Sequence, residues 1–332
     1  MKLLYHKNEV PNFGDDLNAL LWPQIAPELF KSDQDGIGFL GIGTIVGKQL
    51  PNLRKLIVFS SGAGYNPASF AGHDVEVVCV RGPYTAKRLG LAETLAVTDG
   101  AILSPLIFEA APKNGKTLVI PHWETIRGCE QIWQKVCDRA GMALCSPIQD
   151  AETVIREISA AELVLTESLH GAILADTYGV PWIAWASTGN FSEFKWMDWM
   201  SSMRLDYRVS AVPPPHADLA YRLGRVRADE PASEVARRLE GVISASIADP
   251  SFEPPAKTPS AFKQALKLGY YRSGAARVFG GCSPAHTARA LLALKENGDR
   301  QLSDPDVRQS RHQDMQNRLQ KLIADYSSEK LG

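Results

Sequence analysis

The sequence has few cysteines, and no two of them are spaced as a metal site requires. There are five, and none forms a C-x-x-C pair: Cys79, Cys129, Cys137, Cys145 and Cys282. An odd number without such pairs argues against a disulfide framework and against structural zinc, and it favours a reducing compartment. The rest of the chain contains no convincing cluster of metal ligands either, and we expect neither a resident metal nor a cofactor.

Long apolar runs are also missing. No window approaches the ~20 apolar residues of a membrane-spanning helix. Met1-Lys2 leads into a short apolar run and then a polar loop, which differs from the apolar core of a signal peptide. The expected location is the cytoplasm.

No excess of either charge is present, because 36 Lys and Arg oppose 37 Asp and Glu. This balance gives no reason to expect a nucleic-acid partner. The sequence also lacks G-x-x-x-x-G-K-[ST], H-E-x-x-H and a complete G-x-G-x-x-G, the usual marks of nucleotide hydrolysis, zinc proteolysis and dinucleotide binding. At 332 residues, 45% hydrophobic and 22% charged, the chain is typical of a soluble globular enzyme with two domains.

What the chain does contain is a repeated strand–helix rhythm. Short apolar runs bounded by Gly, Pro or Asp are typical of buried parallel strands. In the first third we expect a loop at 12–16, helices from about Leu17 and at 85–89, and strands at 3–5, 36–43, 56–60, 76–80 and 95–98.

The rhythm repeats more clearly after a Pro- and Gly-containing stretch at 104–116. Here we expect strands at 117–120 and 143–145, strands beginning at Leu163 and Trp182, and helices at 130–140, 151–161 and 231–248. This alternation predicts an α/β fold with two Rossmann-like, doubly wound parallel-sheet domains facing a cleft. We place the domains at 1–108 and 116–250.

Residues 256–332 form a third region, which we expect to be a basic amphipathic and helical tail. Residues 257–279 carry cations and aromatics without acids, a pattern suited to peripheral contact with an anionic inner-membrane surface. A solvated or domain-packing helix is the alternative, and we favour it. Residues 297–312 look like a flexible connector and 313–327 like a final helix.

The most informative stretch is Leu163 to Trp182, LVLTESLHGAILADTYGVPW. It predicts a strand, a tight turn, a helix that His170-Gly171 opens, and a second strand. Ligands of open α/β sheets collect outside the carboxyl ends of the strands, where helix N-termini favour anions. His170 can therefore face a bound anion and exchange a proton. A purely structural histidine that caps the helix explains the pattern equally well.

Other polar groups follow predicted strands. Arg81 can grip phosphate or carboxylate, although a salt bridge to a neighbouring carboxylate is the alternative. Glycines in Gly41–Thr44 and Ser61–Gly64 let backbone N–H groups approach an anion. His122 is a second histidine at the cleft edge. A histidine at such a position can contact a ligand, but more often it does not. Asp99 more simply caps the next segment.

Two kinds of residue suit a sugar substrate. Asp15 or Asp16 can take a proton from a sugar hydroxyl, although one of them can also cap the following helix. Aromatic rings pack on sugar C–H surfaces but more often build the core. We assign Trp199 to the core and leave open the other members of the cluster, Trp182, Trp185, Phe191, Phe194 and Trp196.

In order along about residues 1–205, the chain resembles the polysaccharide pyruvyl transferase family, particularly its bacterial exopolysaccharide members of the succinoglycan ketalase type. No single motif decides this resemblance, but the combination of several motifs in the same order is fairly specific. The matching pieces are Asn12-Phe13-Gly14-Asp15, Gly41-Ile42-Gly43-Thr44, Val80 to Thr85, Val97-Thr98-Asp99, Ser168-Leu169-His170-Gly171 and Lys195 to Trp199.

The resemblance implies a fold similar to GT-B glycosyltransferases. It also implies phosphoenolpyruvate as co-substrate and, as acceptor, a sugar diol on a polymer or a lipid-pyrophosphate-linked oligosaccharide. Members commonly carry an arginine before the Leu-His-Gly step, where this chain has Ser168. Arg81, Lys195 or a helix N-terminus would have to replace that cation.

We expect His170, with Asp15 or Asp16, to carry acid–base chemistry. The expected substrate-binding residues are Asn12, Gly43, Gly62, Arg81, His122, Ser168, Leu169, Gly171 and Lys195. Two other functions remain open at this point. One is a GT-B-like glycosyltransferase that uses a nucleotide sugar, and the other is a non-catalytic glycan- or membrane-associated scaffold.

Overall fold

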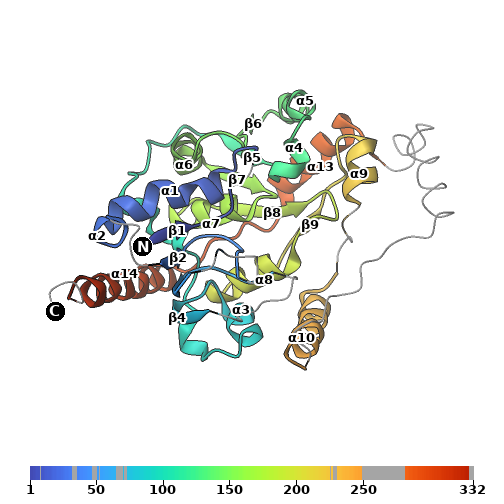
Figure 1. Ribbon diagram of the computed structural model, residues 1–332. Helices are drawn as coiled ribbons and strands as arrows, with labels where there is room; N and C mark the ends of the chain where they lie inside the picture. The colour runs from blue at the N-terminus through green and yellow to red at the C-terminus, as the bar shows by residue number, and fades with distance from the viewer. Residues whose placement is uncertain are drawn as a thin grey trace.

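The computed structural model describes residues 1–7, 9–31, 36–46, 51, 53–64, 70, 73–224, 226, 230–248 and 281–328. Two sheets, each entirely parallel, form its centre (Figure 1). This confirms the α/β class predicted from the alternating pattern. The basic segment 257–279 lies outside the described residues. The domain boundaries stay a prediction.

The first sheet has the strand order β1-β2-β3-β4. Its strands are β1 (Lys2–Leu4), β2 (Ile37–Leu40), β3 (Lys55–Phe59) and β4 (Asp74–Cys79). In register, Leu4 pairs with Leu40 and Leu40 with Val58. All of β2 is buried, as expected of a parallel strand covered on both faces.

The second sheet has the order β6-β5-β7-β8-β9. Its strands are β5 (Thr117–Ile120), β6 (Ala143–Leu144), β7 (Leu163–Thr166), β8 (Trp182–Ala186) and β9 (Ser210–Ala211). The three central strands, β5, β7 and β8, are buried throughout. The predicted βα rhythm was correct here, and the apolar runs of β5, β7 and β8 are covered strands.

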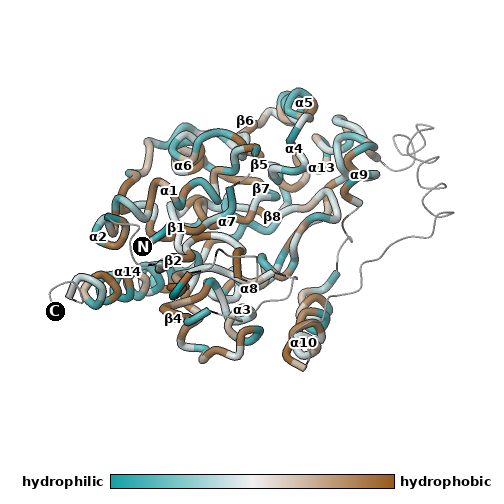
Figure 2. Tube along the Cα trace, viewed as in Figure 1, coloured by the Kyte–Doolittle hydropathy of each residue, from teal (hydrophilic) through white to brown (hydrophobic). Residues whose placement is uncertain are grey.

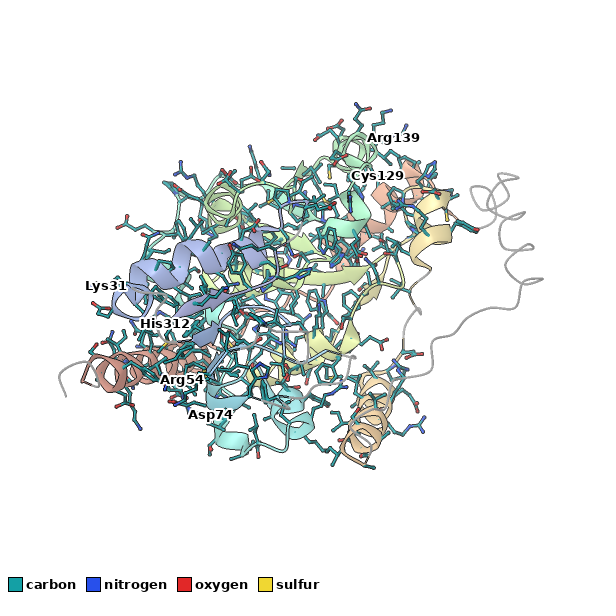
Figure 3. All side chains as sticks on the ribbon, viewed as in Figure 1. Lys31, Arg54, Asp74, Cys129, Arg139 and His312 are labelled. Carbon is teal, nitrogen blue, oxygen red and sulfur yellow. The ribbon has the colours of Figure 1, made fainter. Side chains whose placement is uncertain are left out.

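The helices cover the sheets with one apolar face each. In α5 (Glu130–Ala140) the buried side chains Trp133, Val136, Cys137 and Ala140 follow helical spacing. The helix ends at Gly141, whose φ of 61° is left-handed. Arg139 and Lys31 lie at the periphery (Figure 3), as charged side chains of outer helices should.

The remaining helices fill the connections and the two ends of the chain. They are α1 (Phe13–Ile25), α2 (Pro27–Phe30), α3 (Pro83–Arg88), α4 (Trp123–Ile126), α6 (Ala151–Ala160), α7 (Leu169–Thr177), α8 (Glu193–Ser202), α9 (Ala217–Leu223), α10 (Ala232–Ala248), α13 (Pro284–Asn297) and α14 (Pro305–Ser328). In Figure 2, α10 and α14 alternate hydrophilic and hydrophobic colour along their turns.

Three local predictions were wrong. Residues 95–98 form no regular strand: Ala96 makes an isolated bridge to Val80, between the 3-10 helices Glu93–Leu95 and Gly100–Leu106. The predicted loop 12–16 is helical from Phe13. The predicted connector 297–312 is structured, because Gln301 pairs with Trp182 and α14 begins at Pro305.

The C-terminal helix α14 contacts elements that surround both sheets. Near its start, Arg311 Nε donates to the backbone oxygen of Ser202 at 3.0 Å. Further along, Arg318 donates to Val78 O at 2.8 Å. Met315 is buried in an apolar cluster that includes side chains of both sheets. Figure 1 shows α14 beside α2, next to the first sheet. Residues 305–328 are therefore part of the folded body.

Candidate functional site

A cavity of about 270 Å³ lies where the carboxyl ends of both sheets meet. Residues just after β1, β2 and β4 line one side of it, and residues after β5, β7 and β8 line the other. The side chains that bear on the chemistry are Asn12, Asp15, Thr44, Arg81, His122, Glu124, His170, Asn190 and Lys195.

The first turn of α1 brings carboxylates to this cavity. Asn12 precedes the helix; its backbone N–H donates to Asp16 Oδ2 at 3.0 Å and its Nδ2 donates to Asp15 Oδ2 at 2.8 Å. Acidic side chains are stabilised in a first turn by its free N–H groups, which is why the helix starts before them. Asp15 lines the cavity, whereas Asp16 holds the start of the helix and is not among the lining residues.

The turn between β7 and α7 is closed by Thr166. Its hydroxyl accepts from Ser168 N at 3.0 Å and donates to Ser168 O at 2.8 Å. A Cβ at Gly171 would lie 2.4 Å from this hydroxyl oxygen, so the residue at 171 has to be glycine for the turn to close. Gly171 therefore shapes the turn and is not among the lining residues, whereas Ser168, Leu169 and His170 are.

His170 is wedged into the edge of the cavity, with its side chain 14% exposed. A Cβ at Gly14 would lie 1.9 Å from His170 Nδ1, so α1 approaches the imidazole at a residue without a side chain. Burial lowers the pKa of His170 to about 4; Asp15 raises the pKa, while Arg81 and Lys195 lower it further. At neutral pH the ring is uncharged, with one N–H donor and one acceptor nitrogen.

Arg81 follows β4 and lines the same cavity. Its Nε donates to Asp198 Oδ2 at 3.0 Å, Nη1 to Thr44 Oγ1 at 3.0 Å and Nη2 to Ala63 O at 3.1 Å. A Cβ at Gly62 would lie 2.2 Å from Arg81 Cζ, which explains the glycine there. The salt bridge considered as an alternative is thus present, and the guanidinium still reaches the cavity.

Asp198, on α8, is a residue to which the sequence had assigned no role. Besides Arg81, its carboxylate accepts from Thr85 N at 2.8 Å and Thr85 Oγ1 at 2.7 Å. It is fully buried. One signal in the sequence could have indicated a role for Asp198. It lies three residues after Lys195, and therefore on the same side of a helix, in a stretch already matched to the family.

On the other side of the cavity, a buried carboxylate joins three strand ends. Glu167 accepts from His122 N at 3.0 Å and Thr125 Oγ1 at 2.7 Å, and from both Ser187 N and Ser187 Oγ at 2.7 Å. Burial raises the pKa of Glu167, and these donors lower it in part. Four donors to one buried carboxylate fix the positions of the segments that follow β5, β7 and β8.

His122 belongs to a polar group at the same rim. Its Nδ1 lies 3.1 Å from Asn190 Nδ2, which also donates to Glu124 Oε2 at 2.8 Å. Burial and the nearby Lys195 lower the pKa of His122 to about 3. Sequence reasoning had not selected Asn190, because it lies 68 residues from His122 and only the fold joins them.

Comparison with known proteins was decisive for the family. Residues 47–188 match the family described as polysaccharide pyruvyl transferase. The chain is also 36% identical to the succinoglycan biosynthesis protein ExoV of Rhizobium meliloti (strain 1021) over 219 residues, which covers 64% of this chain and 68% of that protein. The chain belongs to the polysaccharide pyruvyl transferase family.

Membership confirms the resemblance found in the sequence and makes this protein a member of a transferase family. The matched residues 47–188 contain Arg81, His122 and His170 but end before Lys195. The first turn of α1 lies outside them as well. The cavity of this pyruvyl transferase family member therefore combines side chains from within the matched range with side chains from outside it.

The aromatic cluster divides into two groups. Trp182, Trp185, Phe194 and Trp199 are buried in the core, as predicted for Trp199. Phe191 lines the cavity and stacks on Trp196, with ring centroids 5.3 Å apart and an interplanar angle of 22°. Trp196 borders the cavity but is itself buried, so the partly exposed aromatic residues of this pyruvyl transferase family member at the site are Phe191 and Trp123.

Of the residues predicted from the sequence, Asn12, Asp15, Gly43, Arg81, His122, Ser168, Leu169, His170 and Lys195 line this one cavity. Asp16, Gly62 and Gly171 support neighbours instead. Among residues that the structure describes, no group of three or more His, Cys, Asp or Glu is arranged to bind a metal ion. Within the same residues, no helix combines the length and apolar character needed to cross a membrane.

Proposed function

We propose that this protein transfers pyruvate from phosphoenolpyruvate to a sugar diol of an exopolysaccharide or its lipid-linked precursor, forming a cyclic ketal. Family membership supports pyruvyl transfer to a polysaccharide. The observation that carries the donor assignment is one cavity in which an imidazole, a guanidinium and an ammonium meet: His170, Arg81 and Lys195.

Phosphoenolpyruvate carries a carboxylate and a phosphate, so its site needs cations and N–H donors. Arg81 lies at one end of the lining, and Lys195 is close enough to His122 and His170 to lower the pKa of both. Leu169 and His170 line the cavity at the start of α7, where the free backbone N–H groups of the first turn favour an anion. With Ser168 at the position where family members commonly carry an arginine, these groups supply the positive charge.

The reaction fits the residue types present. Protonation of the methylene carbon of phosphoenolpyruvate gives a methyl group and an oxocarbenium-like centre at the adjacent carbon. One sugar hydroxyl attacks that carbon, the bond to the phosphate oxygen breaks, and the second hydroxyl closes the ring. One proton enters the methyl group, two leave the hydroxyls, and phosphate departs with the balance.

His170 and Asp15 are our candidates for these proton transfers. His170 is neutral at pH 7, so its acceptor nitrogen can take a proton, and the imidazolium formed in this way can bind the phosphate. Asp15 lines the same cavity and is our candidate to deprotonate the acceptor hydroxyl. Asp16 already binds the backbone N–H of Asn12, so we give it a supporting role.

We assign the acceptor sugar to the opposite rim. Asn190, Glu124 and His122 offer hydrogen-bonding groups, and the half-buried Phe191 offers an aromatic ring for sugar C–H surfaces. A GT-B-like arrangement of the two sheets is part of the same proposal, as is a cytoplasmic location. The cysteines of the described residues are free, as in a reducing compartment.

The deciding experiment is calorimetric titration of the full chain with phosphoenolpyruvate and, separately, with uridine and guanosine nucleotide sugars. Phosphoenolpyruvate should bind, and incubation with it and candidate pyrophosphate-linked oligosaccharides should add the mass of a pyruvate ketal. Binding of a nucleotide sugar alone would replace this proposal with a glycosyltransferase.

His170→Ala tests the role of the imidazole. We expect pyruvyl transfer to fall by at least about 10²-fold, the usual scale for loss of a general acid or base. The free energy of unfolding should change by no more than about 1–2 kcal/mol. Near-full activity of the variant, measured by phosphate release, would remove His170 from the mechanism.

A further inference from the structure

We propose that Asp99 is a positioning residue that holds the imidazole of His170 in its Nε2–H tautomer. The inference rests on the proposed role of His170 in proton transfer. It deepens that role by naming the group that orients the ring.

One oxygen of the Asp99 carboxylate accepts a hydrogen bond, and the other does not. Oδ1 accepts from Ala101 N at 3.0 Å and caps the 3-10 helix Gly100–Leu106. Oδ2 is buried and has no hydrogen-bond partner among the described residues. His170 Nε2 lies 3.9 Å from it. A buried carboxylate oxygen without a donor is costly, so a small approach of the imidazole N–H is favourable.

Residues of α1 pack against the imidazole on the side away from Asp99. Gly14 lies against Nδ1, and Phe13 meets the ring edge to face with centroids 6.4 Å apart. The ring therefore has little freedom to leave Asp99. Hydrogen bonds between catalytic groups are often long without substrate and shorten when it binds, and 3.9 Å fits that pattern.

Charge favours the same assignment. Burial raises the pKa of Asp99 to about 6 and lowers that of His170 to about 4, so at pH 7.5 a carboxylate faces a neutral ring. An anion beside Nε2 selects the tautomer with its proton there, as a carboxylate does for a catalytic histidine generally. The acceptor nitrogen is then Nδ1, which faces the first turn of α1. The other charged groups around the ring are Asp15, Arg81 and Lys195.

The test is a long-range ¹⁵N–¹H spectrum of the full chain labelled at histidine, assigned to His170 by its loss in His170→Ala. The wild type at pH 7.5 should show the Nε2–H tautomer. In Asp99→Asn the Oδ1 cap remains, but an amide N–H replaces the anion, so the Nδ1–H tautomer should appear. Pyruvyl transfer should fall by about 10²-fold in kcat, with a smaller change in KM for phosphoenolpyruvate.

The matched control is Asp176→Asn. Asp176 is a buried carboxylate on the same helix as His170, and it binds Trp182 Nε1 and Ser303 rather than the imidazole. This variant should lose stability and keep the His170 tautomer. An Nδ1–H tautomer in the wild type, or an unchanged tautomer in Asp99→Asn, overturns the inference. Because the spectrum needs no substrate, a failure of the phosphoenolpyruvate proposal is recorded separately by titration.

Discussion

At the scale of single residues, the cavity combines groups that burial keeps uncharged with groups that remain ionic. His122 and His170 both have lowered pKa values, to about 3 and about 4, and each stands beside a strand end. Arg81 and Asp198 instead form a buried ion pair. Neutral imidazoles therefore line the same cavity as a fixed cation, an arrangement that suits the proton transfers proposed above.

The low pKa of His122 makes a prediction for acid stability. Between pH 6.5 and 3 the unfolded chain binds a proton at this residue that the folded chain does not, so stability falls as pH falls. At pH 5 the cost is about 2 kcal/mol. His122→Asn, which keeps a helix-capping side chain, should therefore lose less stability than the wild type between pH 7 and pH 5 in urea unfolding.

His216 provides the control for this measurement. It is exposed and accepts from Asp218 N at the start of α9, much as His122 accepts from Glu124 N. An effect that comes from losing the helix cap alone should appear in both His216→Asn and His122→Asn, whereas an effect that comes from burial should appear only in His122→Asn. If the two substitutions change the pH dependence of unfolding equally, burial of His122 is not the cause of the loss of stability in acid.

Sequence reasoning identified most cavity residues that follow a strand directly, because strand ends gather at one edge of a parallel sheet. His170, Arg81 and His122 were found in this way. Asp198 and Asn190 received no role, since their partners lie 117 and 68 residues away and only the tertiary fold brings them together.

At the scale of elements, one carboxylate organises the contact between α8 and α3. Asp198 binds Thr85 in the first turn of α3 and Arg81 just before it. Gly82 is required at this contact, because a Cβ there would lie 2.1 Å from Asp198 O. The same contact fixes the guanidinium at the cavity, so packing of two helices and geometry of the site depend on one another.

Asp198→Asn should therefore cost about 3–5 kcal/mol of unfolding free energy, the usual result of removing one partner of a buried ion pair. Chemical denaturation gives the value directly. Glu152→Gln is the control: it breaks an exposed pair with Arg156 and should cost less than about 0.5 kcal/mol. Equal small losses in both variants would contradict the role of Asp198.

Element boundaries were predicted less well than the elements themselves. The segment around Gly14 reads as a turn, yet α1 starts at Phe13 because Asp15 and Asp16 bind the groups at its beginning. The polar stretch before 313 reads as a connector. Pro305 in fact begins α14, a position that suits proline, and Asp176 on α7 binds Ser303.

At the scale of the whole molecule, α14 joins the two sheets. It contacts Ser202 on α8 near its start and the Val78 backbone of β4 further along, and Tyr326 binds Glu76 near its end. Met315, midway, is fully buried, with Sδ 3.6 Å from Cys79 Sγ. The last helix therefore contributes to the stability of the first sheet.

Met315→Ala should lower the free energy of unfolding by about 2–5 kcal/mol, the range for emptying a buried position of this size. Leu302→Ala, at a position 38% exposed just before the same helix, should cost about 0.5 kcal/mol or less. Urea denaturation of both variants makes the comparison. If the two losses are alike, α14 does not stabilise the folded body as described.

Because α14 contacts elements around both sheets, it also restricts how far the two sheets can move apart. A wide hinge motion between the sheets would have to break the bonds of Asp176 on α7 to Ser303, just before α14, or the contacts of α14 at Val78 and Glu76. Substrate entry therefore has to rely on small rearrangements of side chains that line the cavity, such as Phe191 and Lys195. The acceptor glycan of the proposed reaction would then present its sugar to an entrance whose width is largely set in advance.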